Sequence, residues 1–497
     1  MTRLSAAMTA DLDVQARDHL LRVDGQEDVC LALYSPSTGQ ARSAAALTRL
    51  VLPQSGERSV HGNASFTGQY VVRAASEAAK VGLGIALMHS HPTGTGWQGM
   101  SGTDHDTEKS YARVAQTITG LPLLGMTIAG DAAWSARFWQ ENGANCDAES
   151  VRVAGPSLRM TWNNTIRPAP ALTAAQVRTV SAWGDTVQAS LARLRVLVVG
   201  VGTVGLNLAI RLVQVGIQQV SVMDFDTVEI LNLDRLITAS RLDAALFRSK
   251  VYIAMRAMRA AATTATPKLD GYELSVCEPA GLRTALDYDV IFSCVDRPWA
   301  RAVLNQIAYT DLIPVIDGGL AIDPFPKGGM RNATWRAHVI TPGRPCMQCT
   351  GQIDGAQVAR DRAGLLDDQT YIRTAGIKAP SRENVSLLAP SVTASMLAQF
   401  ISLTVTPGGF GAPSPLRFSL STHTLEHLPQ ETLDACPYEQ AVSQGDRRSK
   451  LTADHRAADE ARSQRQRLAR TARVRIGRTA QHAVEQAARA MNRVWAR

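Results

Sequence analysis

The sequence predicts an α/β protein with two domains, the second of which is built on a doubly wound parallel sheet. Between residues 176 and 435, continuous apolar runs of strand length alternate with helical stretches, a pattern typical of a mainly parallel sheet covered on both faces. These runs occupy 195–200, 220–225, 290–295 and 313–317. Residues 1–145 form a separate mixture of short apolar runs and helices, and a chain of 497 residues can bury more than one core.

Two further segments complete the predicted organisation. Residues 146–175 show little periodic pattern and contain the run PAPAL, so we expect a linker there. Residues 436–497 form a tail in which Ala and Arg recur at helix-compatible spacing. From 446 to 497 the tail holds fourteen Lys and Arg against five Asp and Glu, a surplus of nine, whereas the whole chain has a surplus of eight. The remainder therefore carries a net charge of −1, and the basic balance belongs to the tail.

The composition is that of a folded protein of the cytoplasm. Hydrophobic residues make up 45% of the chain and charged residues 19%. No apolar run approaches the roughly 18 residues of a membrane span, and the N-terminus lacks the apolar core of a secretory signal. Seven scattered cysteines do not form a disulfide framework, which indicates a reducing compartment.

For the tail, a solvated helix or disordered extension is favoured over docking to an acidic protein. Nucleic acid is disfavoured, because Trp495 is the only aromatic residue among the arginines of 446–497.

A candidate metal site lies in the N-terminal domain, in the stretch GIALMHSHPTGTGWQGMSGTDHD. His89 and His91 alternate at the end of an apolar strand, so both imidazoles project from one face, and Asp104 follows thirteen residues after His91. Two histidines and one carboxylate leave a tetrahedral Zn²⁺ with an open position for a water, whose pKa the metal lowers. A nearby carboxylate must then take the proton of that water and return it to the leaving amine.

This pattern of an upstream Glu, then His-x-His-Pro, then Ser-x-x-Asp resembles the JAB/JAMM family of zinc isopeptidases over about 130 residues. The resemblance implies a cytidine-deaminase-like α/β fold in which the two histidines and the aspartate bind zinc. It implies that Ser101 helps to hold the tetrahedral intermediate and that Glu27 is the general base, with the adjacent Asp28 as the alternative. Nine residues separate His91 from Ser101, a longer loop than is common in the family.

A glycine-rich loop follows the first predicted strand of the second domain. In RVLVVGVGTVGLNLAIRL a strand leads into Gly200-x-Gly202-x-x-Gly205 and then into a helix. Glycines permit the tight turn and the close approach of backbone to phosphate, and a helix N-terminus favours an anion. This motif, with Asp224 about twenty residues further on, also fits any dinucleotide-binding Rossmann domain.

Further charged and polar residues distinguish the second domain from a plain dinucleotide-binding domain. Activating a carboxylate as an acyl-adenylate needs cations that neutralise a triphosphate and an acid that holds Mg²⁺. A hydride-transferring enzyme needs no such set. The residues concerned lie just after strands or at the start of a helix: Asp224, Asp226, Asn232, Arg235, Lys250 and Asp296.

This stretch is similar to ThiF, MoeB and the ubiquitin-activating enzymes over roughly 250 residues. The resemblance implies ATP and Mg²⁺ as cofactors, bound by the glycine loop and the polar set just described. It implies that Arg301 occupies a position that is usually Arg, whereas Leu236 stands where the family often has Gln and puts one phosphate contact in doubt. The implied roles are ribose binding by Asp224 beside Asp226, phosphate binding by Asn232, Arg235 and Lys250, and magnesium binding by Asp296.

Two questions concern cysteine. Cys346 and Cys349 resemble the first half of a structural zinc site of this superfamily, but Cys436 supplies only one further thiol. His423 or His427 is a candidate fourth ligand, and a pair of reduced buried thiols is the alternative. Relatives that pass their substrate on as a thioester carry a Cys before a helix similar to 385–403. This chain has none between 349 and 436, and Ser381 is the nearest nucleophile for an oxyester. The alternatives are direct release of the adenylate and a serine without a covalent role.

Together the two resemblances predict one polypeptide that adenylates a ubiquitin-like protein with a C-terminal Gly, and that trims or removes this modifier. Such fusions resemble bacterial ubiquitin-like conjugation systems linked to phage defence, which implies a conjugating-enzyme-like partner and a homodimer. Two alternatives stay open: activation of a sulfur-carrier protein for cofactor or metabolite biosynthesis, and a non-catalytic scaffold or binding module. The intact charged set argues against the scaffold.

Overall fold

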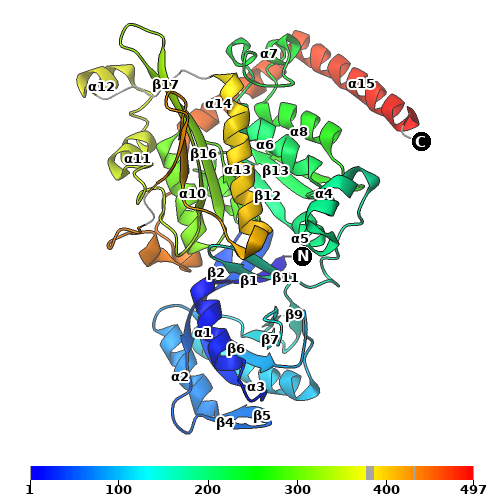
Figure 1. Ribbon diagram of the computed structural model, residues 1–497, viewed down its shortest axis with the longest axis vertical. Helices are drawn as coiled ribbons and strands as arrows, with labels where there is room; N and C mark the ends of the chain where they lie inside the picture. The colour runs from blue at the N-terminus through cyan, green and yellow to red at the C-terminus, as the bar shows by residue number, and fades with distance from the viewer. Residues whose placement is uncertain (1, 377–384, 429–430, 496–497) are drawn as a thin grey trace.

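The computed structural model describes residues 2–376, 385–428 and 431–495. They form two α/β domains stacked along the long axis of the molecule, with the C-terminal helices lying against the second domain (Figure 1). The predicted α/β class and the parallel sheet of the second domain are confirmed.

The first domain is a nine-stranded mixed sheet in the order β11-β10-β1-β3-β2-β6-β7-β8-β9. Alternate residues of β6 enter different cores: Ala86 and Met88 pack on one face, whereas Ile85 and Leu87 pack on the face that α2 and α3 cover. The elements are β1 (Arg3–Thr9), α1 (Ala10–Leu20), β2 (Val29–Thr38), β3 (Arg42–Val51), the hairpin β4 (Arg58–His61) and β5 (Asn63–Phe66), α2 (Gly68–Ala79), β6 (Gly84–His91), α3 (Gly102–Thr119), β7 (Leu124–Ala129), β8 (Trp134–Trp139), β9 (Asn145–Asp147), β10 (Ser150–Ala154) and β11 (Leu158–Trp162).

The sheet extends into the stretch that the sequence predicted as a linker. β10 pairs in parallel with β1 and antiparallel with β11, so the first domain continues to Trp162 and the boundary near 145 is wrong. The apolar pattern of this strand is interrupted by two buried polar residues, Ser150 and Arg152. Arg152 donates to the backbone carbonyls of Asp311 and Leu312 in the second domain.

The second domain is an eight-stranded sheet in the order β14-β13-β12-β15-β16-β17-β18-β19, in which the first five strands are parallel. Helices α6, α8 and α13 pack on one face, and α9 and α10 on the other. The strands are β12 (Arg195–Val199), β13 (Gln219–Met223), β14 (Lys268–Tyr272), β15 (Val290–Ser293), β16 (Val315–Pro324), β17 (Met330–Ile340), β18 (Leu416–Ser419) and β19 (Thr424–His427). The helices are α4 (Val177–Trp183), α5 (Asp185–Arg193), α6 (Thr203–Gln214), α7 (Arg241–Ala245), α8 (Lys250–Ala261), α9 (Pro279–Ala285), α10 (Pro298–Thr310), α11 (Gly355–Arg362), α12 (Gln369–Thr374) and α13 (Ala389–Thr404).

Helix α13 is more apolar than the sequence analysis recognised. With the turn before it, the segment Ser386–Thr404 is long and apolar enough, by length and composition, to cross a membrane. In the structure α13 packs against β16, β17 and α6 and buries Met396, Phe400 and Leu403. The composition therefore matches its place as a core helix on the sheet.

A buried ionic network joins the two domains. Asp289, which immediately precedes β15, accepts a hydrogen bond from Arg42 Nη1 of the first sheet at 2.6 Å and another from the backbone N–H of Arg195 at 2.9 Å. Arg152 lies 3.7 Å from the same carboxylate, and Arg195 pairs with Glu149. We call this network between the domains the joint. Arg42 and Asp289 are almost wholly buried, so each charge depends on its partner in the other domain.

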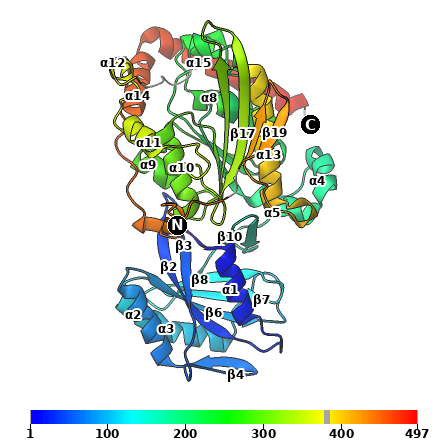
Figure 2. The ribbon, with the colours of Figure 1, turned by 60° about the vertical axis from the view of Figure 1, so that its left-hand side comes forward.

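The tail is helical, as its composition predicts, but it is not a free extension. Helix α14 (Arg456–Ala469) contacts Glu278 at the start of α9 through Arg462. Helix α15 (Ala472–Trp495) lies beside α7 and α8, where Gln481 contacts Asp243 and Glu485 contacts Tyr252 (Figures 1 and 2). Before them, the chain crosses the joint: Arg448 pairs with Asp311, and Asp446 accepts hydrogen bonds from Thr38 of the first domain. The tail is thus a largely exposed helical segment with one side packed on the second domain, and the interpretation as a disordered extension is wrong.

We expect Asp289→Asn to lower the free energy of unfolding by about 3–5 kcal/mol, because it leaves buried arginines without their counter-charge. Chemical denaturation measures this. The control Asp323→Asn removes an ion pair with Arg331 that is exposed on both sides, and should cost no more than about 1 kcal/mol. Equal effects of the two substitutions would contradict a special role for the joint.

The joint also predicts a pH dependence. Burial by itself would raise the pKa of Asp289, but Arg42, Arg195 and Arg152 outweigh it and lower this pKa to about 2. Because the folded pKa lies below the unfolded value of about 3.9, the stabilisation is present above about pH 4 and is lost as pH falls towards 2. Asp289→Asn should flatten this part of the stability profile.

Candidate functional site

Three side chains of the first domain converge as a metal-binding set. His89 Nε2 and His91 Nε2 lie 3.2 Å apart, and Asp104 Oδ2 lies 3.6 Å from the first nitrogen and 3.5 Å from the second. Ligands of a tetrahedral Zn²⁺ at about 2.05 Å are about 3.3 Å from one another. All three side chains are partly exposed, which leaves room for a fourth ligand. The donor set and its spacing fit a zinc ion with one open position.

The local fold explains this convergence. His89 and His91 share the face of β6 that α3 covers, because side chains alternate along a strand. Asp104 lies in the first turn of α3, where Ser101 is the N-cap. The Ser101 N–H donates to Asp104 Oδ2 at 2.8 Å, and Ser101 Oγ accepts from the Asp104 N–H. The cap thus orients the carboxylate, while a role for Ser101 in catalysis stays a prediction.

Neighbouring acids at the start of β2 face different surroundings. Asp28 is buried and accepts a hydrogen bond from Arg58 Nη1 at 3.0 Å, so its charge is already paired. Glu27 is half-buried and lies near the histidines. The hydrogen bond to Asp104 raises the pKa of His91, and the Glu27 carboxylate adds to the rise. Of the two candidate bases, Asp28 is paired with Arg58 and Glu27 is the one whose charge acts on His91, while its role as the base stays a prediction.

Gln98, which the sequence pattern did not single out, contacts His91 on the side away from the metal set. Its Oε1 lies 3.4 Å from His91 Nδ1, and its amide donates to the Thr95 and Gly96 carbonyls of its own loop. The loop is held to the β7–β8 turn by Asp131, whose carboxylate accepts from the Gly96 N–H. The unusual loop length was the available signal. A partner on Nδ1 fixes the ring orientation and leaves Nε2 to bind metal.

The glycine loop of the second domain lies between β12 and α6, where the strand order of the sheet reverses. Gly200 has φ +88°, and a side chain there would meet the Cys294 carbonyl. A Cβ on Gly205 would lie 1.9 Å from the Gly200 carbonyl, so the helix can pack this closely only with glycine. Gly202, at the N-cap of α6, faces open space. This is the geometry that lets backbone approach a phosphate.

Four charged residues gather around that loop. Asp224 accepts hydrogen bonds from the Val201 and Asp226 N–H groups, both at 2.7 Å, and Lys250 Nζ donates to Asp226 at 2.6 Å. Burial by itself would lower the pKa of Lys250, but the charges of Asp224, Asp226 and Asp296 outweigh it and raise that pKa to about 12. The lysine therefore stays charged among three carboxylates.

The other residues predicted to contact the nucleotide have partners outside this group of four. Arg235 donates to the Leu231 carbonyl and pairs with Asp234, and Asn232 caps its own short turn through the Glu229 N–H. Leu236 is 3% exposed and belongs to the core, so no polar contact is available at that position. Arg301 lies 3.5 Å from the buried Asp317. In this structure Arg235 and Asn232 thus make hydrogen bonds within their own segment, 229–235.

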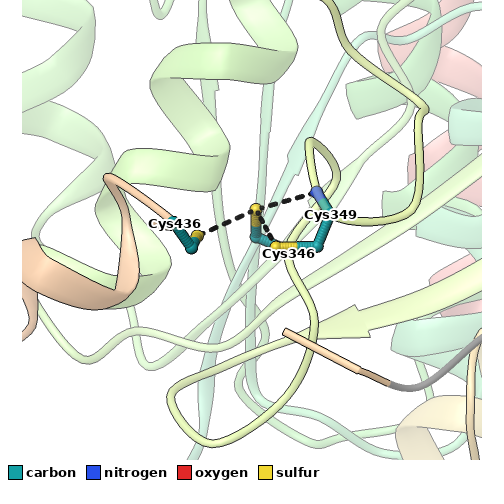
Figure 3. A group of neighbouring side chains, drawn as sticks. All are labelled: Cys346, Cys349 and Cys436. Carbon is teal, nitrogen blue, oxygen red and sulfur yellow. Dashed lines mark hydrogen bonds between the residues drawn. The ribbon is translucent and has the colours of Figure 1, made fainter. Parts of the chain in front are cut away.

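Three cysteines of the second domain form a separate cluster. Cys346 Sγ lies 3.5 Å from Cys349 Sγ and 3.6 Å from Cys436 Sγ, and Figure 3 shows Cys436 approaching the other two from a different segment. Zinc-bound thiolates are about 3.7 Å apart, so the spacing fits. Within the described residues no histidine joins the group, including His423 and His427. Burial raises the pKa of the Cys346 thiol, which opposes metal binding.

Ser381, the candidate for a covalent oxyester, lies outside the described residues. Its role stays a prediction. A covalent adduct that hydroxide cleaves but dithiothreitol does not would support it, and an adduct that survives Ser381→Ala would exclude it.

Taken together, the parallel sheet, the glycine loop at its switch point and the lysine among acids define a nucleotide-binding α/β domain. Residues 173–420 match the model of the ThiF family and form a ThiF family domain. The match begins after the N-terminal sheet.

Several known proteins are similar to this chain. The molybdopterin-synthase adenylyltransferase of Escherichia coli is 28% identical over 173 residues, and that of Salmonella typhimurium is 30% identical over 173 residues. Each alignment covers 34% of this chain and 63% of the relative, so the chain spans less than two thirds of these proteins. The crystal structure of E. coli MccB with AMPCPP and MccA superposes with a TM-score of 0.41 at 16% identity, covering 54% of this chain and 74% of that one.

We expect His89→Ala to lower the zinc content by about one ion per chain, because two remaining ligands hold the metal weakly. Elemental analysis of the purified full-length protein measures this. His105→Ala is the matched control, since His105 lies next to Asp104 on α3 but outside the ligand set. Zinc that bound only at the cysteine cluster would be unaffected by His89→Ala and would contradict the site.

Proposed function

We propose that the ThiF family domain adenylates the C-terminal carboxylate of a small ubiquitin-like protein, and that the N-terminal domain is a zinc isopeptidase acting on the same modifier. The family match and the similarity to two molybdopterin-synthase adenylyltransferases support the first activity. The main observation in its support is the charged Lys250, which lies among three carboxylates beside the glycine loop.

The residues of this site suit attack of a carboxylate on the α-phosphorus of ATP. Lys250, already positioned by Asp226, is a fixed positive charge for the phosphate oxygens as the pyrophosphate leaves. Asp296 is exposed after β15 and is the carboxylate that would hold Mg²⁺, which when bound would supply positive charge to neutralise the phosphates. The loop amides and the N-terminus of α6 would bind the remaining phosphates.

The isopeptidase part of the proposal depends on the histidine pair, Asp104 and Glu27. A zinc ion held there would polarise the scissile carbonyl and lower the pKa of a bound water. Glu27 would take a proton from that water and deliver it to the leaving amine, which requires a carboxylate that is not already paired. That condition is met by Glu27 and not by Asp28.

A second candidate is activation of a sulfur-carrier protein, which the names of the curated relatives favour. Both versions require a protein substrate that ends in Gly, and they differ in the fate of the adenylate: transfer to an amine through a conjugating-enzyme-like partner, or to sulfur. We also propose a cytoplasmic homodimer with a role in bacterial phage defence. Analytical ultracentrifugation tests the dimer, and phage plaque counts with and without the gene test the defence role.

We expect Glu27→Gln to reduce cleavage of a modifier fusion by about 10²–10⁴-fold while zinc content stays unchanged, because a base is lost and no ligand is. The matched variant Asp28→Asn should instead lower the thermal midpoint, since it leaves Arg58 without its buried partner. Normal cleavage by Glu27→Gln would exclude Glu27 as the base.

We expect exchange of pyrophosphate into ATP that requires a protein with a free C-terminal carboxylate, and that Asp296→Ala abolishes. The same substrate with an amidated C-terminus should not support exchange. Asp234→Ala, which removes an exposed acid paired with Arg235, is the matched control and should leave exchange intact. If exchange survived Asp296→Ala, or if the domain bound NAD and showed no ATP chemistry, the proposed site would be wrong.

A further inference from the structure

The C-terminal segment 455–481 lies against the loops that carry the acids and the lysine of the nucleotide site. These loops follow β13 and β15 and precede α8, and none is near the tail in sequence. Figure 1 shows α14 and α15 (red) beside α7 at this side of the domain. We call the segment 455–481 the clasp.

One aromatic ring of the clasp touches two of the loops at once. The His455 ring lies 5.1 Å from the ring of Phe225 and 5.1 Å from that of Trp299, nearly perpendicular to both. Phe225 stands between Asp224 and Asp226, and Trp299 follows Asp296 by three residues. Edge-to-face packing of this kind fixes the separation of the partners. His455 therefore bridges the two acid-bearing loops.

Arg465 holds the backbone of the first of these loops. Its side chain is 6% exposed, and Nη1 donates to the Phe225 carbonyl at 2.7 Å and to Thr227 Oγ1 at 3.0 Å. Nη2 donates to Glu273 at 2.8 Å. The two contacts of Nη1 flank Asp226, which in turn positions Lys250. A planar guanidinium can satisfy three acceptors in different directions, which an ammonium on a flexible stem does less well.

Helix α15 holds the turn that leads into α8. Arg478 donates through Nε to the Leu246 carbonyl at 3.0 Å and through Nη2 to the Phe247 carbonyl at 2.6 Å. Phe247 has φ +48°, a strained conformation for a residue with a side chain, and it needs external contacts to persist. Two residues later, Ser249 caps the helix that Lys250 begins.

We infer that the clasp positions the nucleotide site, and that Arg465 is a positioning residue for ATP binding by the second domain. This inference rests on the proposed adenylating function. Without Arg465, the loop that carries Asp224 and Asp226 loses its outer hydrogen bonds, and Lys250 loses the fixed position of its partner. ATP binding should then weaken, although no clasp residue belongs to the predicted nucleotide-binding set.

The test measures the affinity of the full-length protein for a non-hydrolysable ATP analogue with Mg²⁺ by isothermal titration calorimetry. We expect binding about tenfold weaker in Arg465→Ala and intermediate in Arg465→Lys, which keeps the charge but not the three directed bonds. Arg467→Ala, which removes an exposed arginine from the same helix, should bind like the unmodified protein. In pyrophosphate exchange, Arg465→Ala should raise the KM for ATP and leave the KM for the protein substrate unchanged.

The possible outcomes separate this inference from the proposed function. If the unmodified protein does not bind the analogue, both the adenylating function and the clasp inference fail. If it binds and Arg465→Ala binds equally well, only the clasp inference fails. If Arg465→Ala does not fold, Arg465→Lys and Arg467→Lys decide: weaker binding by the first alone supports the clasp, and equal binding overturns it.

Discussion

The ionic contact of Asp289 with Arg42 and with the start of β12 is the constraint on which both domains depend. Asp289 immediately precedes β15 and binds the backbone N–H of Arg195, the first residue of β12. These two strands flank the point where the sheet order reverses and the glycine loop lies. One buried carboxylate thus joins the domains and fixes the base of the nucleotide site. A buried charge tolerates little displacement, since losing a partner leaves it uncompensated.

The joint also determines where the two sites lie. In the second domain the ionic contact lies at the N-terminal ends of the parallel strands β12 and β15, at Arg195 and Asp289. The glycine loop follows the C-terminal end of β12, at the opposite edge of the sheet. In the first domain the contact between the domains lies at the C-terminal end of β2, where Ser37 donates to Asp311. The histidines lie beside the N-terminal end of that strand, where Val29 pairs with His89. The five residues of β12 span about 16 Å and the ten residues of β2 about 33 Å, so each site lies on the far side of its domain from the joint. The stacked domains of Figure 2 therefore present the sites towards opposite ends of the molecule.

What the sequence could predict depended on whether the signal was local. The four apolar runs of the second domain became β12, β13, β15 and β16, because a strand buried on both faces is apolar throughout. Alternation placed His89 and His91 on one face of β6 for the same local reason. β10 was not predicted, because its Arg152 is buried against the backbone of the second domain. The choice between Glu27 and Asp28 needed Arg58, and the clasp needed carbonyl groups more than 200 residues away in sequence. Such long-range pairings leave no periodic trace.

The charge of the tail illustrates the same limit. From 446 to 497 its fourteen basic residues include one lysine, Lys450, and thirteen arginines. Charge alone would suit phosphate neutralisation, for which lysine serves as well as arginine. The described contacts instead use the directed donors of the guanidinium: Arg462 binds both oxygens of Glu278, and Arg478 binds two neighbouring carbonyls. Arg465 adds a carbonyl, a hydroxyl and a carboxylate. At these three positions the preference for arginine over lysine is explained by several directed hydrogen bonds per side chain inside the protein.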